Sequence, residues 1–283
     1  MPRATLPPMR FTLSGLENKV AVVTGAGRLR SIGRPIAVEL ARAGCDVVLT
    51  GTGRSPDRYP DDEKAVSWRD IDSVADEVRA LGRTALPIVS DVSQLEAVEG
   101  LAARTLDELG RVDIVVNNAG AAKGGDRNPV IDVDPESWRK VIDVNLTGSF
   151  MMSKVFGRIM VEAGRGGSIV NISSVAGKRL PPNAAAYAAS KAGIHALTAC
   201  MAQEVGAANI RVNAVCPGTV ETSRMDNFGR GDVWQQYIKD NTPLGRAGTG
   251  EDIANAVVFL CSDEGAWVTG QSWNVDGGAV VQH

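Results

Sequence analysis

Short runs of β-branched residues alternate with longer stretches of helical periodicity along nearly the whole chain, and this alternation restricts the possible folds more than any other feature. It is typical of β-α units whose parallel strands are buried on both faces of a sheet. The predicted strands are Lys19–Thr24, Asp46–Thr50, Thr84–Ser90, Val112–Asn117, Gly167–Ser173, Asn209–Cys216 and Gln271–Val275. The predicted helices are Arg34–Ala43, Trp68–Leu81, Gln94–Leu109, Pro135–Ala163, Ala185–Gly206 and Glu251–Cys261.

No Gly/Ser-rich linker or change of composition divides this series, and 283 residues with 44% hydrophobic content suffice for one sizeable core. The sequence therefore predicts an α/β fold: a single doubly wound, Rossmann-like domain with a mostly parallel seven-stranded sheet and helices on both faces. We expect this domain over residues 18–283, after an N-terminal extension, residues 1–17. Glycines that suit C-terminal helix caps follow five of the predicted helical stretches: Gly44, Gly82, Gly110, Gly164 and Gly206.

The charge and composition of the chain argue against several classes of function. Thirty basic and thirty-three acidic residues give a net charge of −3 without a block of like charge, which disfavours nucleic acid and membrane surfaces as partners. Four scattered cysteines indicate neither a disulfide framework nor a zinc site, and two histidines make a His-rich metal site improbable. No signal peptide or transmembrane run is present. We expect a cytoplasmic protein with a small-molecule substrate and no metal.

Two long segments interrupt the alternation. Residues 53–64 are polar and contain Pro56 and Pro60, and residues 221–244 carry several aromatic side chains. Long loops in compact domains are often functional, although the first segment can equally be a tolerated surface insertion. We predict that residues 221–244 form a lid over the ligand site. The alternative is that the aromatic side chains of this segment simply pack on the domain.

A glycine-rich turn follows the first predicted strand, from Thr24 to Gly33. Glycines at such a turn let the backbone approach a diphosphate, whose charge is held by free N–H groups and the helix dipole. The spacing differs from G-x-G-x-x-G, and glycine-rich turns also serve only to close a chain. A position after the first strand of a parallel series favours nucleotide binding. The candidate binding residues here are Gly25, Gly27, Arg28, Ser31, Ile32 and Gly33.

Tyr187 and Lys191 are four residues apart in a predicted helix, which places them on one face. A phenol with a pKa near ~10 is a poor catalyst at neutral pH, and a nearby ammonium lowers that pKa. Such a pair alone is usually an exposed helix face. Here, however, Ser174 and Asn117-Asn118-Ala119-Gly120 end two predicted strands, and the polar Asn145 interrupts a helical stretch. These groups are expected to converge at one edge of the sheet.

Together these motifs resemble the short-chain dehydrogenase/reductase family over residues 18–279. The resemblance implies an NAD(P)-dependent oxidoreductase that transfers a hydride between a nicotinamide cofactor and a carbonyl or secondary alcohol. The glycine turn departs from the family pattern by two extra residues and by Ser31 in place of the middle glycine. The matching motifs beyond this turn are Asp91-Val92, Asn117-Asn118-Ala119-Gly120, Asn145, Ser174, Tyr187-x-x-x-Lys191, Pro217-Gly218-Thr219-Val220 and Val275-Asp276-Gly277-Gly278.

The resemblance also implies roles for individual residues. Tyr187 is the expected general acid/base and Ser174 holds and polarises the substrate oxygen. Lys191 binds the nicotinamide ribose and lowers the pKa of Tyr187, and Asn145 anchors a water of the proton relay. Independently, we expect His195 to be structural, and strand alternation turns Ser173 away from Ser174. The remaining cofactor contacts are expected from Asp91, Val92, Asn118, Ala119, Gly120, Pro217, Gly218, Val220 and Thr222.

The end of the second strand bears on the choice between NADP and NAD. The position that would carry a ribose-binding acid is Gly51, so no carboxylate there repels a 2′-phosphate. Arg54 and Thr52 follow it and are suited to bind that phosphate, with further charge from Arg28 or Arg30. These features favour NADP over NAD. Two alternatives remain: Arg54 points into solvent, or the inserted loop folds back a carboxylate, namely that of Asp57, Asp61 or Asp62.

Two alternative functions remain at the level of sequence. One is a carrier-linked 3-oxoacyl reductase of fatty-acid synthesis, and the other is a dinucleotide-binding regulator without turnover. The complete set of acid/base residues argues against the regulator. By family resemblance, the helical stretches 135–163 and 185–206 pair across two-fold axes, which predicts a homotetramer or a homodimer.

Overall fold

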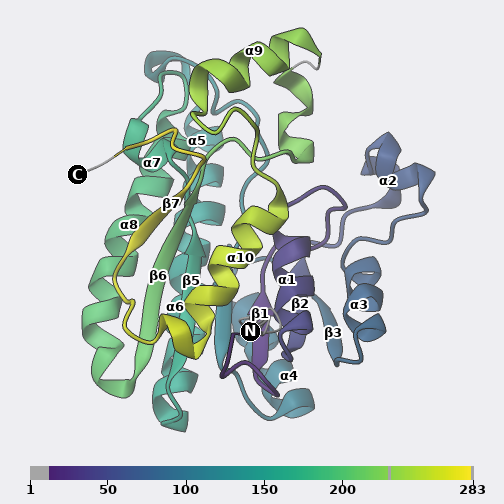
Figure 1. The fold of residues 1–283 in the computed structure, drawn as a ribbon, viewed down its shortest axis with the longest axis vertical. Coiled ribbons are helices and arrows are strands. Elements are labelled where there is room, and N and C mark those ends of the chain that lie inside the picture. The colour runs from purple at the N-terminus through teal and green to yellow at the C-terminus, as the bar shows by residue number, and fades with distance from the viewer. Residues whose placement is uncertain (1–12, 229–230, 282–283) are drawn as a thin grey trace, which may run out of the picture.

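The computed structural model describes residues 13–228 and 231–281 and contains one seven-stranded sheet in the order β3-β2-β1-β4-β5-β6-β7, with every neighbouring pair parallel (Figure 1). The order reverses between β1 and β4, where doubly wound folds bind their ligands. This confirms the predicted fold class. The strands are β1 (Val20–Val23), β2 (Asp46–Gly51), β3 (Ala85–Val89), β4 (Ile114–Asn117), β5 (Gly167–Ile172), β6 (Ile210–Pro217) and β7 (Ser272–Val275).

Helices cover both faces of the sheet because its strands are apolar on both sides. One core contains Ile36 and Leu40 of α1 with residues of α3 and α10, and the other contains Leu101 of α4 and Phe156 of α6. The helices are α1 (Gly33–Arg42), α2 (Asp61–Ala65), α3 (Ile71–Ala80), α4 (Leu95–Leu109), α5 (Pro135–Ile142), α6 (Gly148–Ala163), α7 (Ala176–Arg179), α8 (Ala185–Val205), α9 (Asp232–Asn241) and α10 (Gly250–Cys261).

The predicted single helix Pro135–Ala163 is wrong in one important detail. A π-helical turn, Asp143–Thr147, separates α5 from α6. Such a turn locally changes which side chains face inward, and π-turns are frequent at functional sites. Asn145 lies in this turn and is buried, with 1% of its surface exposed. Asn145, which the sequence analysis identified as an unusual polar residue in a helical stretch, therefore lies in a distorted part of the helix.

Two other boundaries also differ from prediction. Gly206 has a helical φ of −58°, and the left-handed residue after the helix is Asn209 at φ +57°. Of the predicted extension, residues 1–12 lie outside the described part of the chain, but Leu16 is 1% exposed and packs in the core. Ser14 donates from its N–H and its hydroxyl to the Glu264 carboxylate at 2.9 and 2.8 Å. Residues 13–17 are therefore part of the folded domain.

Among residues 13–228 and 231–281, no helix is long and apolar enough to cross a membrane. The segment after β6 places α9 beyond the carboxyl edge of the sheet (Figure 1). On α9, Trp234 and Ile238 are 4% and 2% exposed. Burial of these two side chains is compatible with both the predicted lid and its alternative.

Candidate active site

The predicted acid/base pair lies where α8 passes the carboxyl end of β5. Lys191 is 4% exposed, and its Nζ donates to the carbonyl oxygen of Ile172 at 2.7 Å. This bond holds the ammonium in place, 5.8 Å from the centroid of the Tyr187 ring. Ser174 stands two residues after the end of β5, and its hydroxyl accepts the N–H of Ala176 at 3.1 Å. The structure therefore brings together the three residues that the sequence placed on two separate elements.

Asn145 connects the elements on either side of the tyrosine. Its side-chain oxygen accepts the N–H of Ala121 at 2.8 Å, and its Nδ2 donates to the Ser190 hydroxyl at 3.0 Å. Ser190 in turn donates to the carbonyl oxygen of Tyr187 at 2.7 Å. Because both ends of this buried amide bond to protein, the side chain holds α8 against the loop after β4.

Three cations surround the ring of Tyr187. The guanidinium carbons of Arg127 and Arg224 lie 4.5 and 5.4 Å from the ring centroid, and Lys191 is the third. Burial raises the pKa of Tyr187, but Lys191, Arg224, a Ser174 hydrogen bond and Arg127 outweigh it, so the net pKa is below the usual value. Burial lowers the pKa of Lys191. The sequence did not place Arg127 or Arg224 beside Tyr187, because neither residue belongs to a motif.

The cations around Tyr187 lead to a pH prediction. As the general base that the family resemblance implies, Tyr187 would act as a phenolate in the oxidation of an alcohol, so the rate should rise with pH through a midpoint that reports this pKa. Arg224 lowers the pKa, and its removal should therefore raise it. We expect the midpoint for Arg224→Met to move to higher pH, measured as kcat/KM for alcohol oxidation. Arg158→Met, an exposed site on α6, is the control and should not move it. A shift to lower pH would contradict the assignment.

His195 is held by neighbours and does not face the reacting groups. Its Nε2 lies 2.8 Å from the Ser173 hydroxyl and 3.3 Å from Cys216 Sγ. Burial, followed by the charges of Lys178 and Lys191, lowers its pKa to about 4, so the ring is neutral at neutral pH. Ser173 also donates to the carbonyl oxygen of Lys191 at 2.9 Å. Both residues anchor α8, which agrees with the structural role predicted for His195.

The glycine-rich turn packs tightly against the end of β4. Gly25 has φ +66°, and a Cβ there would lie 2.8 Å from Ala119 Cα. The Asn118 amide donates to the carbonyl oxygens of Thr24 and Gly25 at 2.8 and 3.0 Å. A Cβ at Gly33 would lie 2.5 Å from Asn118 Nδ2. The missing side chains at Gly25 and Gly33 therefore let the turn pack against Asn118 and Ala119 at the N-terminus of α1, where the sequence predicts the cofactor diphosphate.

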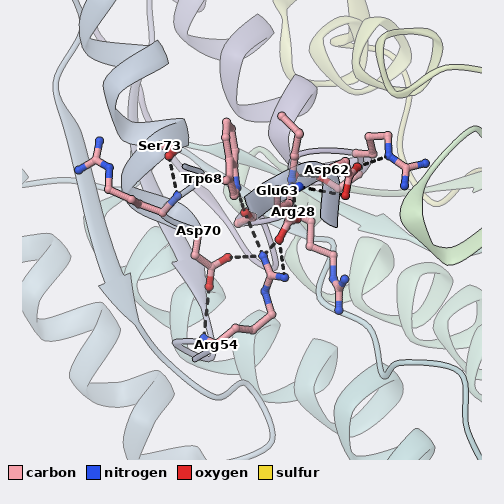
Figure 2. Close-up of polar contacts among 12 residues, drawn as sticks. Arg28, Arg54, Asp62, Glu63, Trp68, Asp70 and Ser73 are labelled. Carbon is pink, nitrogen blue, oxygen red and sulfur yellow. Dashed lines mark hydrogen bonds and ion pairs between the residues drawn. The ribbon is translucent and has the colours of Figure 1, made fainter. Parts of the chain in front are cut away.

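The glycine-rich turn also contacts the inserted segment. Trp68 Nε1 donates to the carbonyl oxygen of Gly27 at 2.6 Å, and the N–H of Leu29 donates to the Glu63 carboxylate at 3.0 Å (Figure 2). Arg30 pairs with Asp62 at 2.5 Å and with Asp226, in the segment before α9, also at 2.5 Å. The inserted segment is thus tied to the turn through Asp62, Glu63 and Trp68.

The structure changes the basis for the NADP prediction. Arg54 is part of a buried ion-pair cluster, with its guanidinium 2.8 Å from Glu63 and 3.1 Å from Asp70 (Figure 2). Its backbone N–H also donates to Asp70, at 3.3 Å. The Glu63 side chain is 1% exposed, whereas that of Asp70 keeps 9% of its surface exposed. Arg54 therefore neither points into solvent nor offers an unopposed charge, and Asp62 pairs with Arg30 instead.

The other predicted cofactor residues follow the carboxyl ends of β1, β3, β4 and β6. Ser31 accepts the N–H of Arg34 at 3.2 Å and donates to the carbonyl oxygen of Arg28 at 2.9 Å, so it supports the start of α1. The Arg28 guanidinium makes no hydrogen bond or ion pair with another described side chain, although Arg54, Glu63 and Asp70 lie close enough to act on its charge. Val92 and Val220 are each 5% exposed, and Thr222 is 9% exposed. Gly120, Pro217 and Gly218 lie beside these residues along the same edge.

The comparisons with known proteins agree with this arrangement. A family model described as enoyl-(acyl carrier protein) reductase matches residues 25–280. A 3-oxoacyl-[acyl-carrier-protein] reductase of Synechocystis is 36% identical over 270 residues, which cover 95% of this chain and 100% of that protein. A 7alpha-hydroxysteroid dehydrogenase of Escherichia coli is 34% identical over 267 residues, covering 94% and 96%.

A solved structure gives the same result for the fold. Carveol dehydrogenase from Mycobacterium avium in complex with NAD superposes with a TM-score of 0.83 at 33% identity, covering 93% of this chain and 98% of that one. The fold, the site and these likenesses define a nicotinamide-dependent oxidoreductase. The chain belongs to the short-chain dehydrogenase/reductase family.

Proposed function

We propose that this oxidoreductase interconverts a carbonyl and a secondary alcohol with Tyr187 as general acid/base. The observation that supports it is the grouping of Tyr187, Lys191 and Ser174 at the carboxyl edge, with the pKa of Tyr187 lowered by surrounding positive charge. A regulator without turnover would not need such an acid. The grouping therefore favours catalysis over binding alone.

Each residue has a role that follows from its contacts. The bound nicotinamide cofactor supplies or accepts the hydride. Tyr187 donates its proton to the substrate oxygen during reduction and removes it during oxidation, while the Ser174 hydroxyl holds that oxygen. Lys191, fixed by Ile172, stabilises the phenolate and faces the nicotinamide ribose. Asn145 keeps α8 in position, so we assign it a positioning role.

We propose that NAD is preferred over NADP. Asp70 Oδ2 and Oδ1 lie 3.7 and 4.0 Å from the place that a Cβ at Gly51 would occupy. Position 51 is where an acid that binds the ribose would normally stand. A Cβ at Gly27 would lie 1.7 Å from Asp70 Oδ1, so this glycine makes room for the carboxylate. The insertion thus provides, from a different part of the chain, the negative charge that the end of β2 lacks.

Different residues are proposed to contact different parts of the cofactor. Asp70 accepts hydrogen bonds from the adenosine ribose hydroxyls and repels a 2′-phosphate. Arg28, whose guanidinium has no ion-pair partner among residues 13–228 and 231–281, faces the diphosphate. Asp91 and Val92 line the adenine site, and Val220 and Thr222 the carboxamide site.

The segment 221–244 is proposed as a lid on the single domain, which includes residues 13–17 in addition to the predicted range. The ion pair of Arg30 with Asp226 joins this segment to the glycine turn, so closure of the lid and cofactor binding affect each other. Water exclusion by such a segment would strengthen the electrostatic interactions around Tyr187. We further propose a cytoplasmic homotetramer or homodimer that pairs through α5–α6 and α8.

A carrier-linked 3-oxoacyl reductase is the second candidate, because the Synechocystis relative bears that name. A panel of ketones, oxo acids and carrier-linked 3-oxoacyl substrates with NADH and NADPH tests both candidates. The readout is absorbance at the nicotinamide band. We expect turnover that requires Tyr187 and is faster with NADH. Absence of Tyr187-dependent turnover across the panel would refute the proposed function.

A further inference from the structure

The electrostatic environment of the catalytic tyrosine is more positive than proton transfer requires. Lys191 already supplies the charge that stabilises the phenolate. Arg127 and Arg224 add two guanidinium groups, at 4.5 and 5.4 Å from the Tyr187 ring centroid. They come from the loop after β4 and from the segment after β6, so residues about a hundred positions apart converge on one ring.

A third cation stands beside them. Lys123 Nζ lies 4.0 Å from the sulfur of Met225, next to Arg224 in sequence. Burial lowers the pKa of Lys123, and Arg127 and Arg224 lower it further, which shows that these three charges act on one another. Arg127 and Arg224 are part-buried and Lys123 is exposed, and like charges this close together favour binding of an anion between them.

The protein supplies too few carboxylates to balance this cluster. Asp126, 2% exposed, lies 3.1 Å from Arg127 Nε and also accepts the N–H of Gly124 at 3.1 Å. Within residues 13–228 and 231–281, no carboxylate pairs with Arg224 or Lys123. Arg224 instead donates to the carbonyl oxygen of Ala121. One acidic residue therefore faces three basic ones at the substrate side of Tyr187.

We infer that the substrate carries its own carboxylate close to the reacting carbon, so that the enzyme acts on small oxo acids and the corresponding hydroxy acids. This inference rests on the proposed function and specifies its substrate class. Arg127, Arg224 and Lys123 bind the carboxylate, while Ser174 and Tyr187 hold the carbonyl oxygen. A carrier-linked thioester has no carboxylate at this place, because its phosphate lies at the far end of a long flexible arm.

The inference is tested by binding, without turnover. Wild-type protein saturated with NAD is titrated calorimetrically with straight-chain 2-oxo and 3-oxo acids and with the methyl ester of each. Cofactor and ligand are both oxidised, so no reaction occurs. An acid should bind about 10- to 100-fold more tightly than its ester, the range expected for charge-assisted hydrogen bonds. An acid that binds no more tightly than its ester at any chain length overturns the inference.

The variants are compared by the ratio of the dissociation constants for ester and acid. Any effect of a substitution that weakens the binding of both ligands equally cancels in this ratio. Arg224→Met and Lys123→Met should each reduce the preference for the acid at least about fivefold. Arg158→Met on the exposed side of α6 should leave it unchanged. Arg127→Met leaves the buried Asp126 without its cation, so the melting temperature of this variant is measured before its binding. The test does not depend on this variant, because Arg224→Met and Lys123→Met are sufficient. Full preference in both Arg224→Met and Lys123→Met overturns the inference.

The two proposals fail in different ways. If esters and ketones are reduced in a Tyr187-dependent reaction and acids show no advantage, the inference fails and the proposed function stands. If acids bind tightly but no compound of the panel reacts, the proposed function fails, whereas the anion site stands.

Discussion

Tyr187→Phe should lower kcat by about 10²- to 10⁴-fold, the usual contribution of a positioned general acid/base. The aromatic ring remains, so the packing of α8 and the cations over its face should persist. The loss arises from the hydroxyl alone, because this atom exchanges the proton with the substrate oxygen. The measurement is steady-state kcat on the best substrate of the panel, with cofactor affinity measured separately by titration.

The control for this variant is Tyr59→Phe. Tyr59 lies in the insertion with its ring under Arg54, at 4.8 Å, and its hydroxyl has no part in the proposed proton transfer. Its loss should therefore change kcat only a few-fold. For Tyr187→Phe we expect cofactor affinity to stay within about threefold, since Lys191 and the glycine turn are intact. A fall in kcat of less than about tenfold would remove Tyr187 from its role.

Asp70→Asn should collapse the preference for NAD. The carboxylate accepts charge-assisted hydrogen bonds from the ribose, worth roughly 1.5–3 kcal/mol, so NADH should bind about 10- to 100-fold more weakly. Loss of the negative charge also ends the repulsion of a 2′-phosphate, and NADPH should bind more tightly. The measurement is the ratio of the two dissociation constants, obtained by titration of protein fluorescence, because Trp68 lies beside the site.

Glu63→Gln is the matched control for Asp70. It removes the other carboxylate that pairs with Arg54 but no proposed ribose contact. If both substitutions change the ratio equally, selectivity comes from the charge of Arg54 and not from a direct bond with Asp70. If the unmutated protein prefers NADPH by tenfold or more, the proposed NAD preference is wrong, and Arg28 becomes the residue that binds the 2′-phosphate. Melting temperatures show whether either variant loosens the buried cluster.

The sequence by itself determined the fold and singled out the proposed acid/base pair. Alternating periodicity predicted the order of strands and helices along the chain. Strands that are buried on both faces of a sheet are apolar throughout, whereas helices repeat their apolar residues every three to four positions. The pair of Tyr187 and Lys191 was readable because one helix holds both residues at a fixed spacing. Ser174 was found because strand ends in a parallel sheet share one edge. The π-turn at Asn145 was not predicted, since local periodicity does not specify an extra residue in a helical turn.

Only the tertiary structure decided which charges meet. The absence of an acid at Gly51 and the presence of Arg54 pointed to NADP, and both observations about the sequence were correct. The sequence did not show that Asp70 returns to the space beside Gly51 or that Glu63 and Asp70 balance Arg54. Likewise, Arg127 and Arg224 belong to separate loops and share no spacing. Electrostatic interactions depend on distance and burial in space, whereas sequence patterns record only neighbours along one element.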